Sequence, residues 1–524
     1  MRGERKTDAG NGIVRMVYVA LAVALQVLFI YSLMYRLNAY STVVHIVVEA
    51  FAVLIALSIY GSHETTSMKM PWIVLISSAP LLGVVLWSLF ACRLATKPMR
   101  ERFRLVDRII FEYLEQELNV QPALREKSPA DAGIAEYLWR KGHFPLCRNE
   151  SCQYYADAAD ALEAQIEDLK KAKDFIFIEY FAIENKESFG RIRKVLREKA
   201  AEGVEVRLFY DDVGSIGFIN SRFRASLRED GIQARVFNPV LPGLRVFMNN
   251  RDHRKITVID GKVAYTGGYN LADEYFNVTQ PYGEWKDAGI RVTGPAVDTF
   301  TTIFLEMWNA IHRSDQDDID FRRFYPEHAG DSLMTAAADG DKGFVQPYAD
   351  SPLDEEQVGE NVYMSIANDA SRYLYFTTPY LILTDEMSRA MTLAAEKGVD
   401  VRVVTPGIPD KKITYQLTRS YYAQLVRKGV RIYEFTPGFC HAKCCVSDDR
   451  IATCGTINLD YRSLYHHFED GCVMYGTQSV LDMKADLDAV IARSTEVTGR
   501  YAEGGRNLFV RMFQCILRLA APLF

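Results

Sequence analysis

One stretch of the chain occurs twice, and this repeat limits the possible folds more than any other feature. Residues 253–271 align without gaps on residues 441–459, and eight of the nineteen aligned positions are identical. In order, the identical residues are His, Lys, Val, Asp, Ala, Gly, Asn and Leu. Because polar residues suited to catalysis are among those retained, we expect two related halves about a pseudo-twofold axis, with one site between them.

Both halves show the same alternation of apolar strands and helices. The first half has a strand at 175–181 and a helix that leads into a strand at 200–210, and the second repeats this at 373–376 and 394–404. Strands that alternate with helices indicate βαβ units. The predicted fold class is therefore α/β, with two α/β/α halves that each contain a largely parallel sheet.

These patterns divide the chain into six segments. They are a transmembrane region at 1–92, a charged amphipathic connector at 93–150, a first half at 151–326, a linker at 327–360, a second half at 361–500 and a C-terminal amphipathic helix at 501–524. The linker is assigned from its Asp, Gly, Ala and Pro content. The last segment mixes bulky apolar residues with arginines, so it either lies on anionic lipid or packs on the body.

Long apolar runs fill the N-terminal region. Residues 16–35 and 70–92 contain no charged side chain, and residues 37–62 are nearly as apolar. Helices of this length can cross a hydrocarbon core of about 30 Å, which predicts about three spans and an integral, multi-pass membrane protein. Basic residues are slightly more numerous on the side of the C-terminal body, and crowded cysteines suit a reducing compartment, so we expect that body to be cytoplasmic.

Composition excludes other classes of protein. The chain has 524 residues, 49% of them hydrophobic, with a formal net charge of -6 and 9 cysteines. A negative balance argues against a protein that coats nucleic acid, so we expect no nucleic-acid partner. The cysteines are too sparse for a secreted disulfide scaffold. The sequence leaves the oligomeric state open.

The repeated polar residues form an H-x-K-x4-D motif in each half, and we predict that all six are catalytic. They are His253, Lys255 and Asp260 in the first half, and His441, Lys443 and Asp448 in the second. Residues i and i+2 of a strand point to the same side, so each histidine and lysine reach one pocket.

This residue set suits chemistry at a phosphodiester. One imidazole can attack phosphorus while the other protonates the leaving alkoxide. The lysines, with Asn270 and Asn458 as neutral donors, can stabilise charge on the non-bridging oxygens. Since side chains supply the positive charge, we predict neither a metal ion nor a cofactor.

A zinc site is the alternative for the cysteines near the second motif, which are Cys440, Cys444, Cys445 and Cys454. The first half has no cysteine at the corresponding positions, and the one nearby histidine, His441, already belongs to the repeat. Small buried thiols are therefore the favoured interpretation.

Around these motifs the sequence resembles the cardiolipin synthase branch of the phospholipase D superfamily. The resemblance runs from about residue 170 to 475. The segments that carry it, beside the doubled motif, are YDDVGS at 210–215, NNRDHRK at 249–255, TGGYN at 266–270, WKD at 285–287, PGFCHAK at 437–443 and NLDYRS at 458–463. It implies two phospholipase D-like halves and an enzyme at a bacterial plasma membrane that has anionic lipid as its partner.

The resemblance also implies a reaction. The expected reaction is phosphatidyl transfer between two phosphatidylglycerol molecules, which gives cardiolipin and glycerol. His253 would be the nucleophile, forming a phosphatidyl-histidine, and His441 the acid and later the base. Asp287 and Glu469 match the family's orienting carboxylates, and each is expected to bond an imidazole of the opposite half.

Some positions and alternatives remain open at this point. His467 stands where asparagine is commoner in the family, and cysteines replace aliphatic residues at 444–445. Water or another alcohol could take the phosphatidyl group, which would make the protein a phospholipase D hydrolase or a different transferase. A nuclease shares the motif, but the acidic balance and the apolar N-terminal runs disfavour it.

Overall fold

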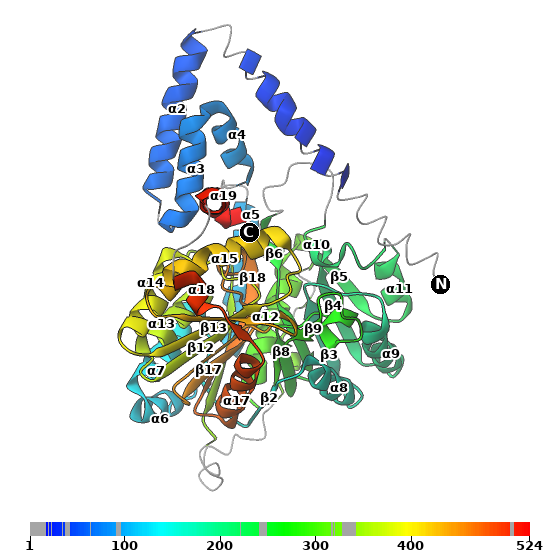
Figure 1. Cartoon of the computed structure of the whole chain (residues 1–524). Coiled ribbons are helices and arrows are strands. Elements are labelled where there is room, and N and C mark those ends of the chain that lie inside the picture. The colour runs from blue at the N-terminus through cyan, green and yellow to red at the C-terminus, as the bar shows by residue number, and fades with distance from the viewer. Residues whose placement is uncertain are drawn as a thin grey trace.

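The computed structural model consists of two α/β halves side by side, with a group of apolar helices beyond one end of them (Figure 1). It describes residues 17–36 except 19, 23 and 34, and then 42–62, 64–90, 96–220, 222–239, 249–315, 318, 320–326, 342–502 and 508–523. All statements below concern these residues.

A seven-stranded sheet forms the first half. Its order is β2 (Ser151–Tyr155), β10 (Gly289–Thr293), β8 (Val263–Gly267), β7 (Lys255–Ile259), β3 (Phe175–Tyr180), β4 (Glu205–Asp211) and β5 (Gln233–Phe237). Only β3, β4 and β5 pair in parallel, and the remaining pairs are antiparallel. The prediction of a largely parallel sheet is therefore wrong, because the repeated segment folds into the antiparallel hairpin β7–β8. Asp260 and Gly261 form the tight turn of this hairpin, and both have positive φ angles.

The second half repeats this sheet and extends it. Its order is β1 (Cys147–Arg148), β11 (Phe344–Asp350), β18 (His467–Tyr475), β17 (Ile451–Gly455), β16 (Cys444–Ser447), β12 (Tyr373–Thr377), β13 (Asp400–Pro406), β14 (Arg431–Phe435) and β19 (Thr495–Glu496). The predicted linker at 327–360 was too long, because β11 lies inside it and is buried along its whole length. Apolar residues at Phe344, Val345 and Tyr348 are the signal for this strand.

Two short strands join the halves. The strand β6 (Arg251–Asp252) of the first half pairs in parallel with β18 of the second, and β15 (Gly438–Cys440) of the second pairs in parallel with β9 (Glu284–Lys286) of the first. The next backbone amides continue both ladders: His253 N–H donates to the carbonyl of Phe468 at 2.8 Å, and His441 N–H donates to that of Lys286 at 2.7 Å. Each catalytic motif thus begins on a strand bonded to the other half.

Helices cover the sheets. In the first half they are α8 (Ala158–Leu169), α9 (Glu187–Ala201), α10 (Asp212–Ser215), α11 (Phe223–Glu229) and α12 (Ala296–Ala310). In the second they are α13 (Val358–Asp369), α14 (Asp385–Glu396), α15 (Lys412–Val426), α16 (Tyr461–Tyr465), α17 (Gln478–Ala492), α18 (Thr498–Ala502) and α19 (Leu508–Leu519). The helix α12 contacts β11 of the second half, and α17 contacts β2 of the first, so the exchange extends to the helical layer.

The predicted connector is packed into the body. It forms α5 (Lys97–Ile110), α6 (Val120–Lys127) and α7 (Pro129–Gly142), and α5 lies against α12. Phe103 of α5 stacks on Phe468 with ring centroids 5.2 Å apart. Its apolar face therefore continues the main core, which spans both halves.

The N-terminal apolar runs form shorter helices than predicted. They are α2 (Thr42–Tyr60), α3 (Thr66–Ser78) and α4 (Pro80–Phe90), of 19, 13 and 11 residues. The run at 70–92 divides because Ala79 leaves the helical conformation just before Pro80. In the part of the chain that the structure describes, no helix has both the length and the apolarity that crossing a bilayer requires. The prediction of about three transmembrane helices in an integral, multi-pass protein is therefore not supported, and the run at 16–35 lies partly outside the described residues.

Candidate active site

The two motif histidines are buried where the exchanged strands meet. Each follows a short strand paired with the opposite half, and each motif lysine comes two residues later, so both side chains of a motif lie on one side of the strand. The side chains of His253 and His441 are each 8% exposed. Lys443 and His441 are among the positive groups that lower the pKa of His253, as expected if the two motifs lie close together.

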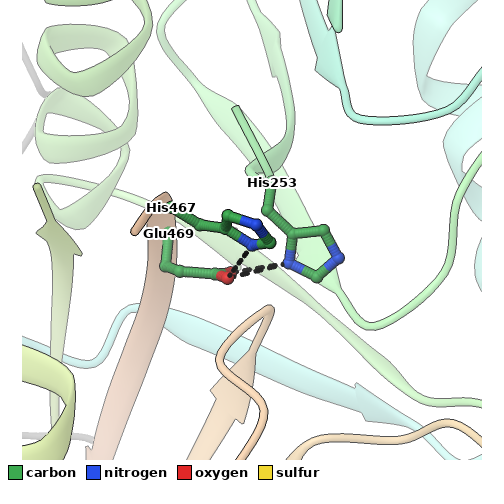
Figure 2. A group of neighbouring side chains, drawn as sticks. All are labelled: His253, His467 and Glu469. Atoms are coloured by element: carbon green, nitrogen blue, oxygen red, sulfur yellow. Dashed lines mark hydrogen bonds and ion pairs between the residues drawn. The ribbon is translucent and has the colours of Figure 1, made fainter. Parts of the chain in front are cut away.

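His253 is bonded to a carboxylate of the other half. Its Nδ1 lies 2.9 and 2.8 Å from the two oxygens of Glu469, which stands on β18. This bond turns Nε2 away from the carboxylate, as Figure 2 shows. Thr456 Oγ1 also donates to Glu469, and the ring of Phe181 meets the imidazole edge to face at 5.0 Å.

His441 has the matching arrangement. Its Nδ1 donates to Oδ2 of Asp287 at 2.7 Å, and the other Asp287 oxygen accepts the N–H of Ala288 at 3.0 Å. The rings of Tyr275 and Trp285 each lie 5.2 Å from the imidazole. The structure therefore brings Asp287 and Glu469 to the opposite half's histidine.

The carboxylates occupy equivalent positions in the two sheets. Gly289 of β10 pairs with Gly267, and Gly471 of β18 pairs with Gly455, so residues 287 and 469 correspond. By the same register Gly268 corresponds to Thr456. A Cβ at Gly268 would lie 2.0 Å from Oδ1 of Asp287, so only glycine fits there.

Both motif lysines are buried next to their histidines. Lys255 donates to the carbonyl of His253 at 2.6 Å, and Lys443 lies 2.9 Å from Nε2 of His441. Burial lowers the pKa of Lys255 to about 8 and that of Lys443 to about 7. Carboxylates such as Asp287 and Glu469 act in the opposite direction but do not outweigh burial, so a bound anion such as a phosphodiester would stabilise the ammonium form of both lysines.

The two asparagines line the same region. Asn270 accepts the N–H of Ala182 at 3.1 Å and donates to the hydroxyl of Tyr275 at 2.8 Å. Oδ1 of Asn458 is buried and has no hydrogen-bond partner among the described residues. The side-chain oxygen of Asn270 therefore fixes the backbone that follows β3.

The motif aspartates do not join this site. Asp260 accepts the backbone N–H groups of Lys173, Asp174 and Phe175, and Asp448 does the same for residues 371–373. Asp260 follows the far end of β7, about 16 Å from Lys255 at the usual rise per residue. The prediction that Asp260 and Asp448 are catalytic is not supported by this geometry, because they hold the hairpin turn against the start of the neighbouring strand.

The two carboxylates differ in charge behaviour. Burial would raise the pKa of Asp287, but His441 and Lys443 outweigh it and hold that pKa below its ordinary value. Burial raises the pKa of Glu469 well above its usual range, although Lys255 and Thr456 oppose it.

The histidines differ accordingly. Burial, followed by the charge of Lys255, holds the pKa of His253 well below its ordinary value. Burial and Lys443 lower the pKa of His441 to about 4, while Asp287 works in the opposite direction. Both shifts favour the neutral form of the imidazole at pH 7.

Several residues of the site lie outside the repeated motif. Thr456, Trp285, Phe181, His467 and Arg462 all contact a histidine, its carboxylate or one of their neighbours. Of these, only His467 was singled out in the sequence, by its departure from the family pattern. The pairing register supplies the signal for Trp285, which stands two residues before Asp287 as His467 stands before Glu469.

The cysteines are buried thiols. Cys444 and Cys454 face each other across β16 and β17, with sulfur atoms 4.0 Å apart. Burial raises the pKa of Cys440 to about 12 and that of Cys445 well above its usual range. Across the described ranges no cysteine belongs to a group with metal-ligand spacing. One other group has that spacing, namely His253, His467 and Glu469, whose ligand atoms lie within 4.8 Å of one another.

Comparison with known proteins identifies the family. The family model described as "Cardiolipin synthase, PLD-like domain" matches residues 165–308 and 363–491, which include both motifs. The chain belongs to this family. It is thus an enzyme of phospholipid phosphatidyl transfer, as the sequence predicted.

Individual relatives agree with the assignment. The chain is 39% identical to an uncharacterized protein of Streptococcus mutans over 89% of this chain and 99% of that one. It is 30% identical to the cardiolipin synthase of Listeria welshimeri over 93% and 99%, respectively. The crystal structure of a phosphatidylserine synthase from Haemophilus influenzae has a TM-score of 0.55 and 15% identity over 75% of this chain and 99% of that one, so it shares the phospholipase D-like fold.

Proposed function

We propose that this member of the family makes cardiolipin from two molecules of phosphatidylglycerol and releases glycerol. The observation that carries the proposal is the exchanged pairing of His253 with Glu469 and of His441 with Asp287 around two buried lysines. This arrangement supplies a nucleophile, an acid and a cationic site for one phosphodiester.

The difference between the carboxylates supports a division of roles. While Glu469 is ionised, burial makes it a stronger base than an exposed carboxylate, so it holds the Nδ1 proton of His253 and leaves the lone pair of Nε2 available for attack. Glu469 therefore suits His253 to attack phosphorus. Asp287 stays ionised and stabilises a positive charge on its partner, so His441 is the better proton carrier.

The two steps balance as follows. The negative charge of the bound phosphodiester raises the pKa of His441, so that this ring takes up a proton in the enzyme–substrate complex. In the first step, Nε2 of His253 bonds to phosphorus, the bond from phosphorus to the glycerol oxygen breaks, and the protonated His441 gives its proton to that oxygen. In the second step, a hydroxyl of another phosphatidylglycerol gives its proton to His441 and bonds to phosphorus, and His253 is released. Lys255 and Lys443 neutralise the non-bridging oxygens throughout.

Exposed apolar surface supports a location at the membrane. Much of α2 is apolar and uncovered, including Val43, Val47 and Leu54. The C-terminal helix α19 packs on α15, with Arg518 over the ring of Tyr421 at 4.0 Å, yet Phe513 and Ile516 remain exposed. Apolar surface this extensive is typical of a membrane-binding face. We propose that α2 to α4 and α19 hold the enzyme on the cytoplasmic leaflet, where its anionic substrate is found.

The test is a transfer assay with the purified full-length protein in mixed micelles. Phosphatidylglycerol as the only phospholipid should yield cardiolipin and glycerol in equal amounts. Phosphatidic acid as the main product would instead identify a hydrolase. Products that appear only after another alcohol is added would identify a different acceptor.

A further inference from the structure

A third histidine lies at the His253 pair and has no assigned role. His467 begins β18, two residues before Glu469, and its side chain is 9% exposed. Its Nδ1 is 3.4 Å from Oε1 of Glu469, and the two imidazole rings lie 5.4 Å apart (Figure 2). Across the described residues this Nδ1 has no hydrogen-bond partner, so the role of its close approach to Glu469 needs an explanation.

A neighbouring arginine determines where His467 carries its proton. Arg462 donates from Nε to Nε2 of His467 at 3.2 Å, and it also reaches the backbone carbonyl of Asn249 at 3.3 Å. A neutral imidazole whose Nε2 accepts a hydrogen bond must carry its hydrogen on Nδ1. The hydrogen of His467 therefore lies on Nδ1, the ring nitrogen next to Glu469, and that nitrogen has no lone pair for a metal ion.

The surrounding charges keep this ring neutral. Burial, and then the positive groups of Arg462, Arg251 and Lys255 with the ring of His466, hold the pKa of His467 well below its ordinary value. Glu469 is the carboxylate that faces it, and His253 bonds the same carboxylate beside it (Figure 2). The same positive groups also disfavour a bound cation.

The other half of the molecule contains a counterpart. By the strand register residue 285 corresponds to residue 467, and Trp285 donates from Nε1 to Oδ2 of Asp287 at 3.4 Å. In both halves a ring nitrogen that carries a hydrogen therefore lies 3.4 Å from the carboxylate two residues further on, and in the Trp285 half this contact is a hydrogen bond. The recurrence of this placement in two independent elements makes an accidental contact a poor explanation.

We infer that His467 is a positioning residue, whose Nδ1–H holds Glu469 against His253 as Trp285 holds Asp287 against His441. Arg462, His467, Glu469 and His253 then form one chain of hydrogen bonds that ends at the reacting nitrogen. The inference rests on the proposed function only in that His253 reacts with a phosphodiester. In this arrangement His467 orients the His253–Glu469 pair, and Trp285 orients the His441–Asp287 pair.

The experiment compares His467→Leu with His467→Asn in the full-length enzyme. Leucine removes the donor, and we expect kcat to fall about tenfold with KM for lipid nearly unchanged, because orientation rather than binding is lost. Asparagine can donate an amide N–H to Glu469 and should keep kcat within about threefold of wild type. Equal impairment of both variants, or of neither, would overturn the inference.

Double-mutant cycles test the route of the effect. His467→Leu should cost little more once Glu469→Gln is present, but its full factor in the presence of Asp287→Asn. Trp285→Phe, the matched control, should show the opposite pattern. If His467→Leu costs the same factor in both backgrounds, it does not act through Glu469.

A substitute variant and two further measurements allow the result to be interpreted. If His467→Leu loses the thermal transition of the wild type, Arg462→Gln replaces it, with an expected severalfold loss that also vanishes in Glu469→Gln. Loss of wild-type activity with chelator and its recovery with zinc would assign His467 to a metal site instead.

A phosphatidyl nitrophenyl diester reports the His253 step alone. Wild-type enzyme that releases nitrophenol without making cardiolipin would therefore refute the proposed acceptor and not this inference.

Discussion

The two half-sites have the same plan but different surroundings. Around His253 the neighbours other than Phe181 are polar: Glu469 accepts from Thr456, His467 lies beside Glu469, and Arg462 bonds His467. Around His441 they are aromatic, with Tyr275, Trp285 and Phe439 within 6 Å of the ring, and glycine takes the place of threonine. The backbone exchange preserved the geometry of the pair, while the side chains around each pair allowed the two histidines to differ in acid–base behaviour.

The largest effect should come from the histidines themselves, which also tests the difference between them. His253→Ala and His441→Ala should each lower transfer at least ~10²-fold in a purified assay. With a nitrophenyl leaving group, His441→Ala should recover a burst of nitrophenol and a trapped phosphatidyl-protein adduct, because the acid is no longer needed. His253→Ala should show neither. An adduct mapped by mass spectrometry to His441 would reverse the roles.

Substitution of the two carboxylates should lower transfer activity to different extents. Asp287→Asn removes the anion that keeps a proton on His441, so we expect transfer to fall about 10²-fold. Glu469→Gln keeps an acceptor for Nδ1 of His253 and should cost about 20-fold. The ratio of kcat values measures the asymmetry, and equal losses would contradict it.

The pH profile should reflect the lysines. Lys443, with its pKa at about 7, and Lys255, with its pKa at about 8, are charged only below these values. The free enzyme therefore loses its phosphate-binding charge as the pH rises, and kcat/KM should fall at least about tenfold between pH 7 and pH 9. A profile that stays flat to pH 9 would show that the charge of the buried lysines is not needed. Lys443→Arg should move the fall to higher pH if charge alone matters.

The motif aspartates should affect stability rather than chemistry. Asp448→Ala leaves the buried backbone N–H of Tyr373 and the part-buried ones of residues 371–372 without their acceptor, which costs about 1–3 kcal/mol of unfolding free energy. The thermal midpoint should drop, while kcat of the folded fraction stays at the wild-type value. Asp260→Ala should behave alike in the other half, and Asp→Asn should be milder at both positions. A large loss of kcat at an unchanged midpoint would return these residues to the active site.

The smallest expected effect is that of a chelator. Because Lys255 and Lys443 supply the positive charge, transfer measured in excess chelator should equal that of the untreated enzyme. A strict need for added divalent ion in the nitrophenol burst, which bypasses lipid packing, would show that the lysines are insufficient in both half-sites.

The sequence indicated the residues of the candidate site more fully than the arrangement of the strands around them. The repeat pointed to both histidines and both lysines, and the family pattern pointed to the two carboxylates. The structure pairs each histidine with one of these carboxylates, and their catalytic roles stay predictions. The aspartates were misassigned because retention in both copies does not distinguish a turn from a catalytic group. The antiparallel hairpins and the exchange between β6 and β18 were missed, because short strands such as Arg251–Asp252 owe their conformation to a partner about 215 residues away.

The exchange of strands also determines when activity can begin during synthesis. Asp287 and the first motif emerge from the ribosome early, yet His253 has no partner until Glu469 is made. At the usual elongation rate, the interval between these carboxylates is about 10–40 s. The apolar N-terminal helices have been exposed long before that. A nascent chain can therefore reach lipid before its active site is complete. A truncated product that stops before β18 lacks both Glu469 and a central strand of the second sheet, so we expect it not to turn over phospholipid.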